Sequence, residues 1–301
     1  MVTVKGKVTW TDILRPTKGD AETLKKKYNF HPIILDEILH PSARSRVEKY
    51  NNYLFLTYHL PFYDPILKTA RRAEIDFLIT KKTVITVHYE QLEPLEVFNR
   101  SISNSVHFKN LAFNDTAKLT YYIIQEIIQF SMRQLKPIEE SISYITQEIF
   151  RNKENKMLET ISYTKRNALD FQIISRPQEI LLNSLSEVGV NFWGDGAQIY
   201  LSDLIGDYSK VMQHLDNNRQ VIEALETTNS QLFNSKMSAV MQKVSIFAFL
   251  TFPLVIILQA FSINSVSSFF DDNPINVLFG IGLAVVITAI TIIIFKKLKW
   301  L

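Results

Sequence analysis

The chain has 301 residues, of which 47% are hydrophobic, and it carries a formal net charge of +3. It contains no cysteine, which excludes disulfides, thiolate metal sites and cysteine nucleophiles. The charge does not gather on a basic face with interleaved aromatic residues, so nucleic acid is not an expected partner. The sequence has no G-x-x-x-x-G-K-[ST] motif and no evident pairing of a nucleophile with a base. Neither a nucleotide-driven motor nor an enzyme is therefore predicted.

Residues 1–112 read as a mixed α/β domain. The alternation of residues 2–10 predicts a strand, and residues 31–39 predict a short helix with Pro32 in its first turn, where the missing N–H costs little. Residues 52–60 and 74–90 are rich in β-branched and aromatic side chains and predict further strands.

The pair Lys81-Lys82 lies between two such runs, and we expect a hairpin turn there.

Residues 113–243 change to a helical period, which begins at about Asn114. Two apolar series with three-and-four spacing predict long packed helices. They comprise Ile124, Ile128, Leu135, Ile138, Ile142, Ile145 and Ile149, and then Leu201, Leu204, Tyr208, Val211, Leu215, Ile222, Leu225 and Leu232. The second series meets no proline before Pro253, so we expect a continuous helix from about Tyr200 into the apolar segment that follows. Such a helix is either a rigid stalk that transmits conformational change or a coiled-coil spacer.

Two segments near the C-terminus, 244–264 and 275–295, contain no charged residue. Each has roughly the 20 residues that a helix needs to cross a bilayer core. We predict two transmembrane helices joined by an external loop, 265–274, and followed by a basic tail, 296–301. Lysines flank the pair of spans, and the loop has none, so the positive-inside rule places both termini in the cytoplasm and the protein in the plasma membrane.

Two membrane helices cannot enclose a water-filled path, so transport requires several chains around an axis. When the spacing of the long helix is continued into the first span, a set of mostly apolar residues falls near one face. This face is the candidate pore wall, and apolar constrictions of this kind gate by dewetting. It comprises Met241, Val244, Ala248, Phe252, Val255 and Gln259.

The first span ends in polar side chains that lipid cannot satisfy. Gln259 and Asn264 present amide oxygens, and Ser262 adds a hydroxyl. A polar ring at the outer mouth is one interpretation. In the other, Asn264 only caps the helix, Gln259 bonds to a neighbouring helix, and Ser262 is a helix-end hydroxyl. Asp271 and Asp272 in the loop are expected to concentrate cations at the mouth.

Several stretches carry a resemblance to the CorA family of magnesium transporters over nearly the whole chain. They are "WTDILRPT" (10–17), "HPIILDEIL" (31–39), "RVEKYNNYLFLTYHLP" (46–61), "FLTFPLVII" (249–257) and "FKKLKWL" (295–301), together with the acidic loop between the spans. The family signature Gly-Met-Asn is matched here by Ser262, Ile263 and Asn264, so only its Asn is kept. The order of all these stretches along the chain is more specific for the family than any single stretch.

The resemblance implies a funnel-shaped homopentamer with an α+β cytosolic domain, long stalk helices and two C-terminal transmembrane helices. It also implies that the first spans line the pore and that cytosolic divalent ions hold it shut. Asp203 falls where the family has an acidic residue of that regulatory site, and the alternative is a solvated helix carboxylate.

From the residues and the resemblance together, we expect a channel for Mg²⁺, with Co²⁺ and Ni²⁺ as further substrates, driven by the membrane potential. Mg²⁺ would be both the transported ion and the regulatory one. Two alternatives stay open, a Zn²⁺ transporter of the same superfamily and a non-conducting membrane sensor.

Overall fold

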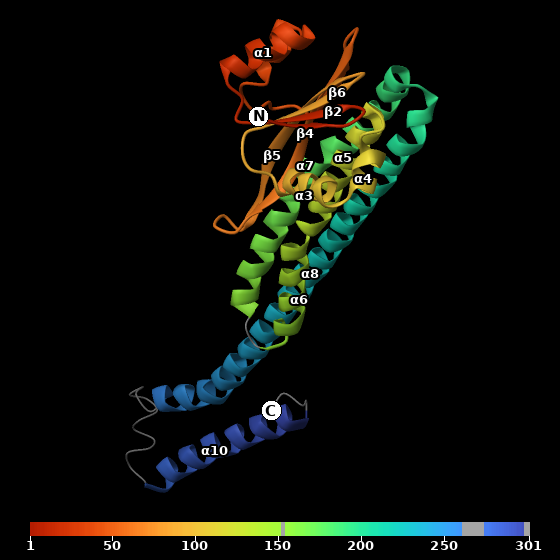
Figure 1. Cartoon of the computed structure of the whole chain (residues 1–301). Helices are drawn as coiled ribbons and strands as arrows, with labels where there is room; N and C mark the ends of the chain where they lie inside the picture. Colours follow the sequence, from red (N-terminus) through yellow and green to blue (C-terminus); the bar gives the residue numbers. More distant parts are fainter. Residues whose placement is uncertain (152–153, 261–273, 298–301) are drawn as a thin grey trace. The chain divides into compact units, whose positions relative to one another are not determined.

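The computed structural model describes residues 1–151, 154–260 and 274–297 (Figure 1). The chain divides into two compact units, unit 1 (Met1–Glu226) and unit 2 (Thr227–Leu301). The division falls inside one long helix, whereas the sequence places boundaries after residues 112 and 243. That finer division, with its membrane and loop segments, stays a prediction.

Among the described residues of unit 1, six strands form one sheet in the order β1-β2-β6-β5-β4-β3. Strands β2 and β6 pair in parallel, and the other neighbouring pairs are antiparallel. The strands are β1 (Val2–Lys5), β2 (Thr9–Leu14), β3 (Arg46–Lys49), β4 (Tyr53–Asp64), β5 (Thr69–Thr80) and β6 (Thr83–His88).

The predicted hairpin at Lys81-Lys82 is confirmed, since β5 and β6 pair antiparallel on either side of it. The hydroxyl of Thr80 accepts hydrogen bonds from the backbone N–H groups of Lys82 (3.3 Å) and Thr83 (2.9 Å). These bonds satisfy backbone N–H groups of the turn that form no hydrogen bond between the two strands. They also fix the position at which the chain reverses direction.

The prediction of one strand over residues 2–10 is wrong. The chain turns between β1 and β2, and the N–H of Gly6 donates to the carbonyl of Val8 at 3.0 Å. A Cβ at Gly6 would lie 2.8 Å from the Cβ of Phe113, so only glycine allows this close approach. Alternation alone does not reveal such a turn, because both strands keep the same period on either side of it.

Different helices cover the two faces of the sheet. On one face α1 (Lys18–Tyr28) and α2 (Pro32–Glu37) contribute Leu24 and Ile34 to a buried cluster with Phe55 of β4 and Leu78 of β5. Pro32 begins α2, as predicted. Figure 1 shows α5 and α7 on the side of the sheet opposite to α1.

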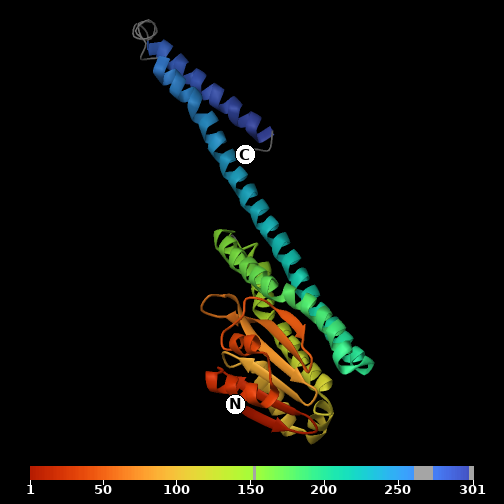
Figure 2. The ribbon, with the colours of Figure 1, turned by 90° about the horizontal axis from the view of Figure 1, so that it is seen from above.

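Helices α3 to α7 form the second layer of unit 1, and Figure 2 also shows α7 running along the sheet. The predicted helical series around Leu135 is divided between two helices. Pro137 lies in the first turn of the second one and cannot donate to the preceding turn. The elements are α3 (Glu93–Asn104), α4 (Val106–Ala112), α5 (Thr116–Arg133), α6 (Lys136–Glu148) and α7 (Glu154–Trp193).

A tight turn joins α7 to α8 (Gln198–Ala260) through the short helix η1 (Asp195–Ala197). Gly194 has a φ of 98°, a conformation that side-chain-bearing residues rarely adopt, and its N–H donates to the carbonyl of Val190 at 2.8 Å. Within unit 1, α8 returns along α7, and the hydroxyl of Tyr208 donates to the carbonyl of Ser175 at 2.8 Å.

The long helix predicted from about Tyr200 is confirmed, because α8 begins at Gln198 and continues to Ala260. A further helix, α10, spans Pro274–Lys297. In the part of the chain that the structure describes, no helix combines the length and apolarity needed to cross a membrane. The two spans at 244–264 and 275–295 therefore stay predictions.

Candidate functional site

The predicted pore wall lies on the part of α8 that belongs to unit 2. Its side chains are exposed in the single chain, with Phe252 at 66% and Val255 at 45% of their full accessible area. Met241, Val244 and Gln259 are exposed as well. These side chains are thus not part of the buried core of a single chain.

The structure does not describe the residues at the polar end of the predicted pore. Ser262 and Asn264, and the loop carboxylates Asp271 and Asp272, lie outside the described residues. Their assignment to selectivity and to cation attraction stays a prediction.

Asp203 lies on α8 within unit 1, with its side chain exposed. The hydroxyl of Tyr121, on α5, donates to Asp203 Oδ2 at 2.6 Å. Burial, and then this bond to a carboxylate, raises the pKa of Tyr121, so the tyrosine stays neutral. No basic nitrogen lies within 4.0 Å of Asp203 among the described residues. The Asp203 side chain is therefore held by a hydrogen bond and forms no ion pair among the described residues, although the charge of Lys210 acts on it from a longer distance.

A second carboxylate, Asp207, lies one helical turn further along α8, and Lys210 Nζ lies 2.7 Å from its Oδ1. Across the described residues, no group of three His, Asp or Glu side chains is arranged to hold a metal ion. The single chain therefore offers Asp203 as one oxygen ligand, without a complete ligand set around it.

The structure also reveals a buried polar network that the sequence reasoning missed. Glu74 and Asp76 lie on β5 opposite His59 and Thr57 of β4. The exposed fraction is 5% for Glu74 and 1% for Asp76. These two cross-strand pairs continue the row that Phe55 and Leu78 begin in the apolar cluster.

Both carboxyl groups are satisfied by nearby donors. The two oxygens of Glu74 each lie 2.8 Å from the backbone N of Ser42, and His59 Nε2 lies 3.1 Å from its Oε2. The hydroxyls of Thr57 (2.8 Å) and Tyr89 (3.0 Å) donate to Asp76. The network thus ties the loop before β3 to the middle of the sheet.

Burial, reinforced by the charge of Glu74, raises the pKa of Asp76 to about 7. Helix α7 joins the same network through Gln178, whose Oε1 accepts from the backbone N of His59 at 3.1 Å. Its Nε2 donates to Ser45 Oγ at 2.7 Å, and that hydroxyl lies 2.9 Å from His59 Nδ1. The two buried carboxyl groups therefore lie where the sheet, a loop and a long helix meet.

The available sequence signal for this network was the stretch "AEIDF" (73–77). Two carboxylates at alternate positions of an otherwise apolar strand must lie on one face. The run by itself predicts only a strand, and nothing local to it indicates His59 or Tyr89 as partners.

The family described as "CorA-like Mg2+ transporter protein" matches residues 5–297. The chain is 22% identical to the cobalt/magnesium transport protein CorA of Thermotoga maritima, over 97% of this chain and 83% of that one. The chain therefore belongs to the CorA-like Mg²⁺ transporter family.

Solved structures agree with this assignment in fold. The complete structure of the CorA magnesium transporter from Methanocaldococcus jannaschii superposes with a TM-score of 0.83 at 19% identity, over 98% of this chain and 92% of that one. The full-length CmaX protein gives a TM-score of 0.73 at 13% identity, over 97% and 89% of the two chains. At these identities the likeness shows the fold alone.

Proposed function

We propose that this protein is a homopentameric channel that carries Mg²⁺, and also Co²⁺ and Ni²⁺, across the plasma membrane. The observation that carries the proposal is the family match from residue 5 to residue 297, which includes both C-terminal helices α8 and α10. In this proposal, segments 244–264 and 275–295 cross the bilayer, and both termini lie in the cytoplasm. Their lack of charged residues supports that placement.

The membrane potential supplies the driving force. One elementary charge gains about 2.3 kcal/mol per 100 mV, so a divalent cation that moves to the negative side gains about 4.6 kcal/mol. This drive needs no nucleotide, in agreement with the missing phosphate-binding motif.

The exposed face of α8 forms the pore wall in this proposal. Five copies bring the side chains of Phe252 and Val255 together around one axis, and an apolar ring of this kind closes by dewetting. At the outer end, the amide oxygens of Asn264 accept hydrogen bonds from the water around a hydrated Mg²⁺, which dehydrates reluctantly. Asp271 and Asp272 attract cations to this end.

Cytosolic Mg²⁺ closes the pore by binding between neighbouring subunits. Asp203 supports this step because it is exposed, held by the hydroxyl of Tyr121 and free of any ion pair within 4.0 Å among the described residues. Since one chain does not complete a ligand set around it, the remaining oxygen ligands come from an adjacent subunit or from water.

The test is ion flux into proteoliposomes under an inside-negative potential, with Mg²⁺, Co²⁺ and Zn²⁺ compared. We expect flux with Mg²⁺ and Co²⁺ and its loss in Asn264→Leu, while size-exclusion chromatography shows an unchanged oligomer. The matched control is Asn273→Leu, the same substitution in the predicted external loop, which keeps the amide ring and should keep most of the flux. Preferred flux of Zn²⁺ would select the zinc alternative. Absence of any flux, beside an active relative, would select the non-conducting sensor.

A further inference from the structure

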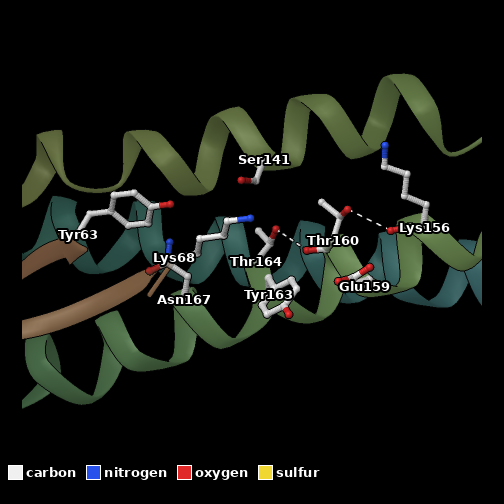
Figure 3. Close-up of a pocket in the computed structure, with 9 residues that line it drawn as sticks. All are labelled: Tyr63, Lys68, Ser141, Lys156, Glu159, Thr160, Tyr163, Thr164 and Asn167. Atoms are coloured by element: carbon white, nitrogen blue, oxygen red, sulfur yellow. Dashed lines mark hydrogen bonds between the residues drawn. The ribbon is translucent and has the colours of Figure 1, made fainter. Parts of the chain in front are cut away.

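A cavity of about 340 Å³ lies in unit 1 between the β4–β5 turn and helices α6 and α7 (Figure 3). Its lining includes Tyr63 and Lys68 from the turn region, Ser141 from α6, and Thr164 and Asn167 from α7. The volume falls within the range of about 300–1,000 Å³ that is typical of small-molecule sites.

Asn167 is the first sign of a binding site. It is 5% exposed, and its Oδ1 has no hydrogen-bond partner among the described residues. Figure 3 shows its amide extending from α7 into the space that Tyr63 and Lys68 also enter. A buried polar atom without a partner is destabilising, so a donor bound here would stabilise the fold.

Lys68 is the second sign. It adopts a left-handed backbone with φ of 53° at the end of a turn in which Asp64 Oδ1 accepts from the backbone N of Ile66 (2.8 Å) and Leu67 (3.1 Å). The next residue is anchored to α7, since the hydroxyl of Thr69 donates to Asp170 Oδ2 at 2.5 Å.

This geometry brings Lys68 Nζ to 6.0 Å from the centroid of the Tyr163 ring, on α7. No carboxylate oxygen lies within 4.0 Å of that nitrogen in the described part of the chain. Lys156 and Glu159 also line the cavity and carry opposite charges. The cavity therefore keeps one positive charge in excess.

Two of the hydroxyls that line the cavity, those of Ser141 and Thr164, can act as acceptors. Ser141 Oγ donates its proton to the carbonyl of Pro137 at 2.8 Å, and Thr164 Oγ1 donates to that of Thr160 at 2.8 Å. Each keeps lone pairs for an incoming donor. With Asn167 Oδ1, they bring three neutral acceptors to the lining, to which Tyr63, Thr160 and Tyr163 add further hydroxyls.

We propose that this cavity binds a small anion that also carries several hydroxyl donors, of the class of a phosphorylated polyol. The anionic group pairs with Lys68, and the hydroxyls donate to Asn167, Ser141 and Thr164. Such a ligand would fasten the β4–β5 turn to α6 and α7. The lining residues all belong to unit 1, so binding can be measured without any measurement of ion flux.

The experiment is isothermal titration of the full-length protein in detergent, at constant ionic strength, with four probes. Glycerol 3-phosphate and glucose 6-phosphate carry both features of the ligand, sulfate carries charge without a hydroxyl donor, and glycerol carries hydroxyls without charge. We expect the two phosphorylated polyols to bind and to raise the midpoint of thermal unfolding, and sulfate and glycerol to bind at least about tenfold more weakly.

Variants then locate the site. Lys68→Met should weaken glucose 6-phosphate binding about tenfold or more, because a charge-assisted hydrogen bond is lost. Asn167→Asp, of nearly the same shape, should weaken it further by repelling the anion. Lys26→Met, another exposed lysine of unit 1, is the matched control and should leave the affinity unchanged.

Circular dichroism of each variant shows whether it folds, and Ser141→Ala is the fallback where Asn167→Asp does not. Four results would overturn the proposal. They are no binding of either polyol phosphate at millimolar concentration, equal binding of sulfate, equal losses in Lys68→Met and Lys26→Met, and unchanged affinity in the folded cavity variants.

Discussion

Asp76 offers a quantitative test of the buried network. Its carboxyl group is 1% exposed and has a pKa of about 7, against an ordinary value of 3.8, chiefly because burial disfavours the ionised form. A difference of about three units, at 1.36 kcal/mol per unit, corresponds to about 4 kcal/mol of folding free energy.

The direction follows from the two pKa values. Below about pH 4 the group is protonated in both the folded and the unfolded chain, and ionisation costs nothing. As the pH rises from about 4 to about 7, the unfolded chain ionises first, so the free energy of unfolding falls. Above about pH 7 both states are ionised and the penalty is constant.

The perturbation is Asp76→Asn. The amide keeps an oxygen for the Thr57 hydroxyl and presents an N–H₂ to the Tyr89 oxygen. That tyrosine still has the carbonyl of His40, at 3.0 Å, as an acceptor for its own proton. We expect the variant to be more stable than the wild type at pH 8 by up to about 4 kcal/mol, with the difference shrinking towards pH 4.

The assay is urea unfolding of the full chain in detergent at a series of pH values, followed by the fluorescence of tryptophan, since Trp10 lies buried in the sheet. The control is Asp195→Asn, which removes an exposed carboxylate and should keep the pH dependence of the wild type. The reasoning is refuted if Asp76→Asn is less stable than the wild type at pH 8, or if the difference between them does not vary with pH.

Three further predictions concern assembly and ion handling. Native mass spectrometry of the solubilised protein should show a pentamer, and a dominant monomer or dimer would count against a pore. Asp203→Ala should weaken the protection that Mg²⁺ gives unit 1 against proteolysis, with Asp195→Ala as the control; an unchanged Mg²⁺ dependence would make Asp203 an ordinary surface carboxylate. The double variant Asp271→Asn with Asp272→Asn should slow cation uptake at low ionic strength and matter less above about 0.1 M salt, where attraction beyond about 10 Å is screened. An equal effect at both salt concentrations would exclude long-range attraction.

Local features of this protein were predictable from sequence because their causes are local. Pro32 begins a helix since its fixed φ suits the first turn, and the hairpin at Lys81-Lys82 follows from two β-branched runs separated by polar residues. The extent of α8 follows from an apolar period that no proline interrupts within unit 1. Family membership follows from the order of many short motifs along the chain.

Tertiary structure alone decided which distant residues meet. Asp76 acquires its raised pKa only because folding excludes water from it and brings it close to the carboxylate of Glu74. Asn167 and Lys68 are separated by about a hundred positions, and they share a cavity only because α7 packs along β4 and β5. The periodicity of a sequence indicates which side of a helix or strand is buried. The desolvation and charge of a site depend instead on which residues of the neighbouring elements pack against it.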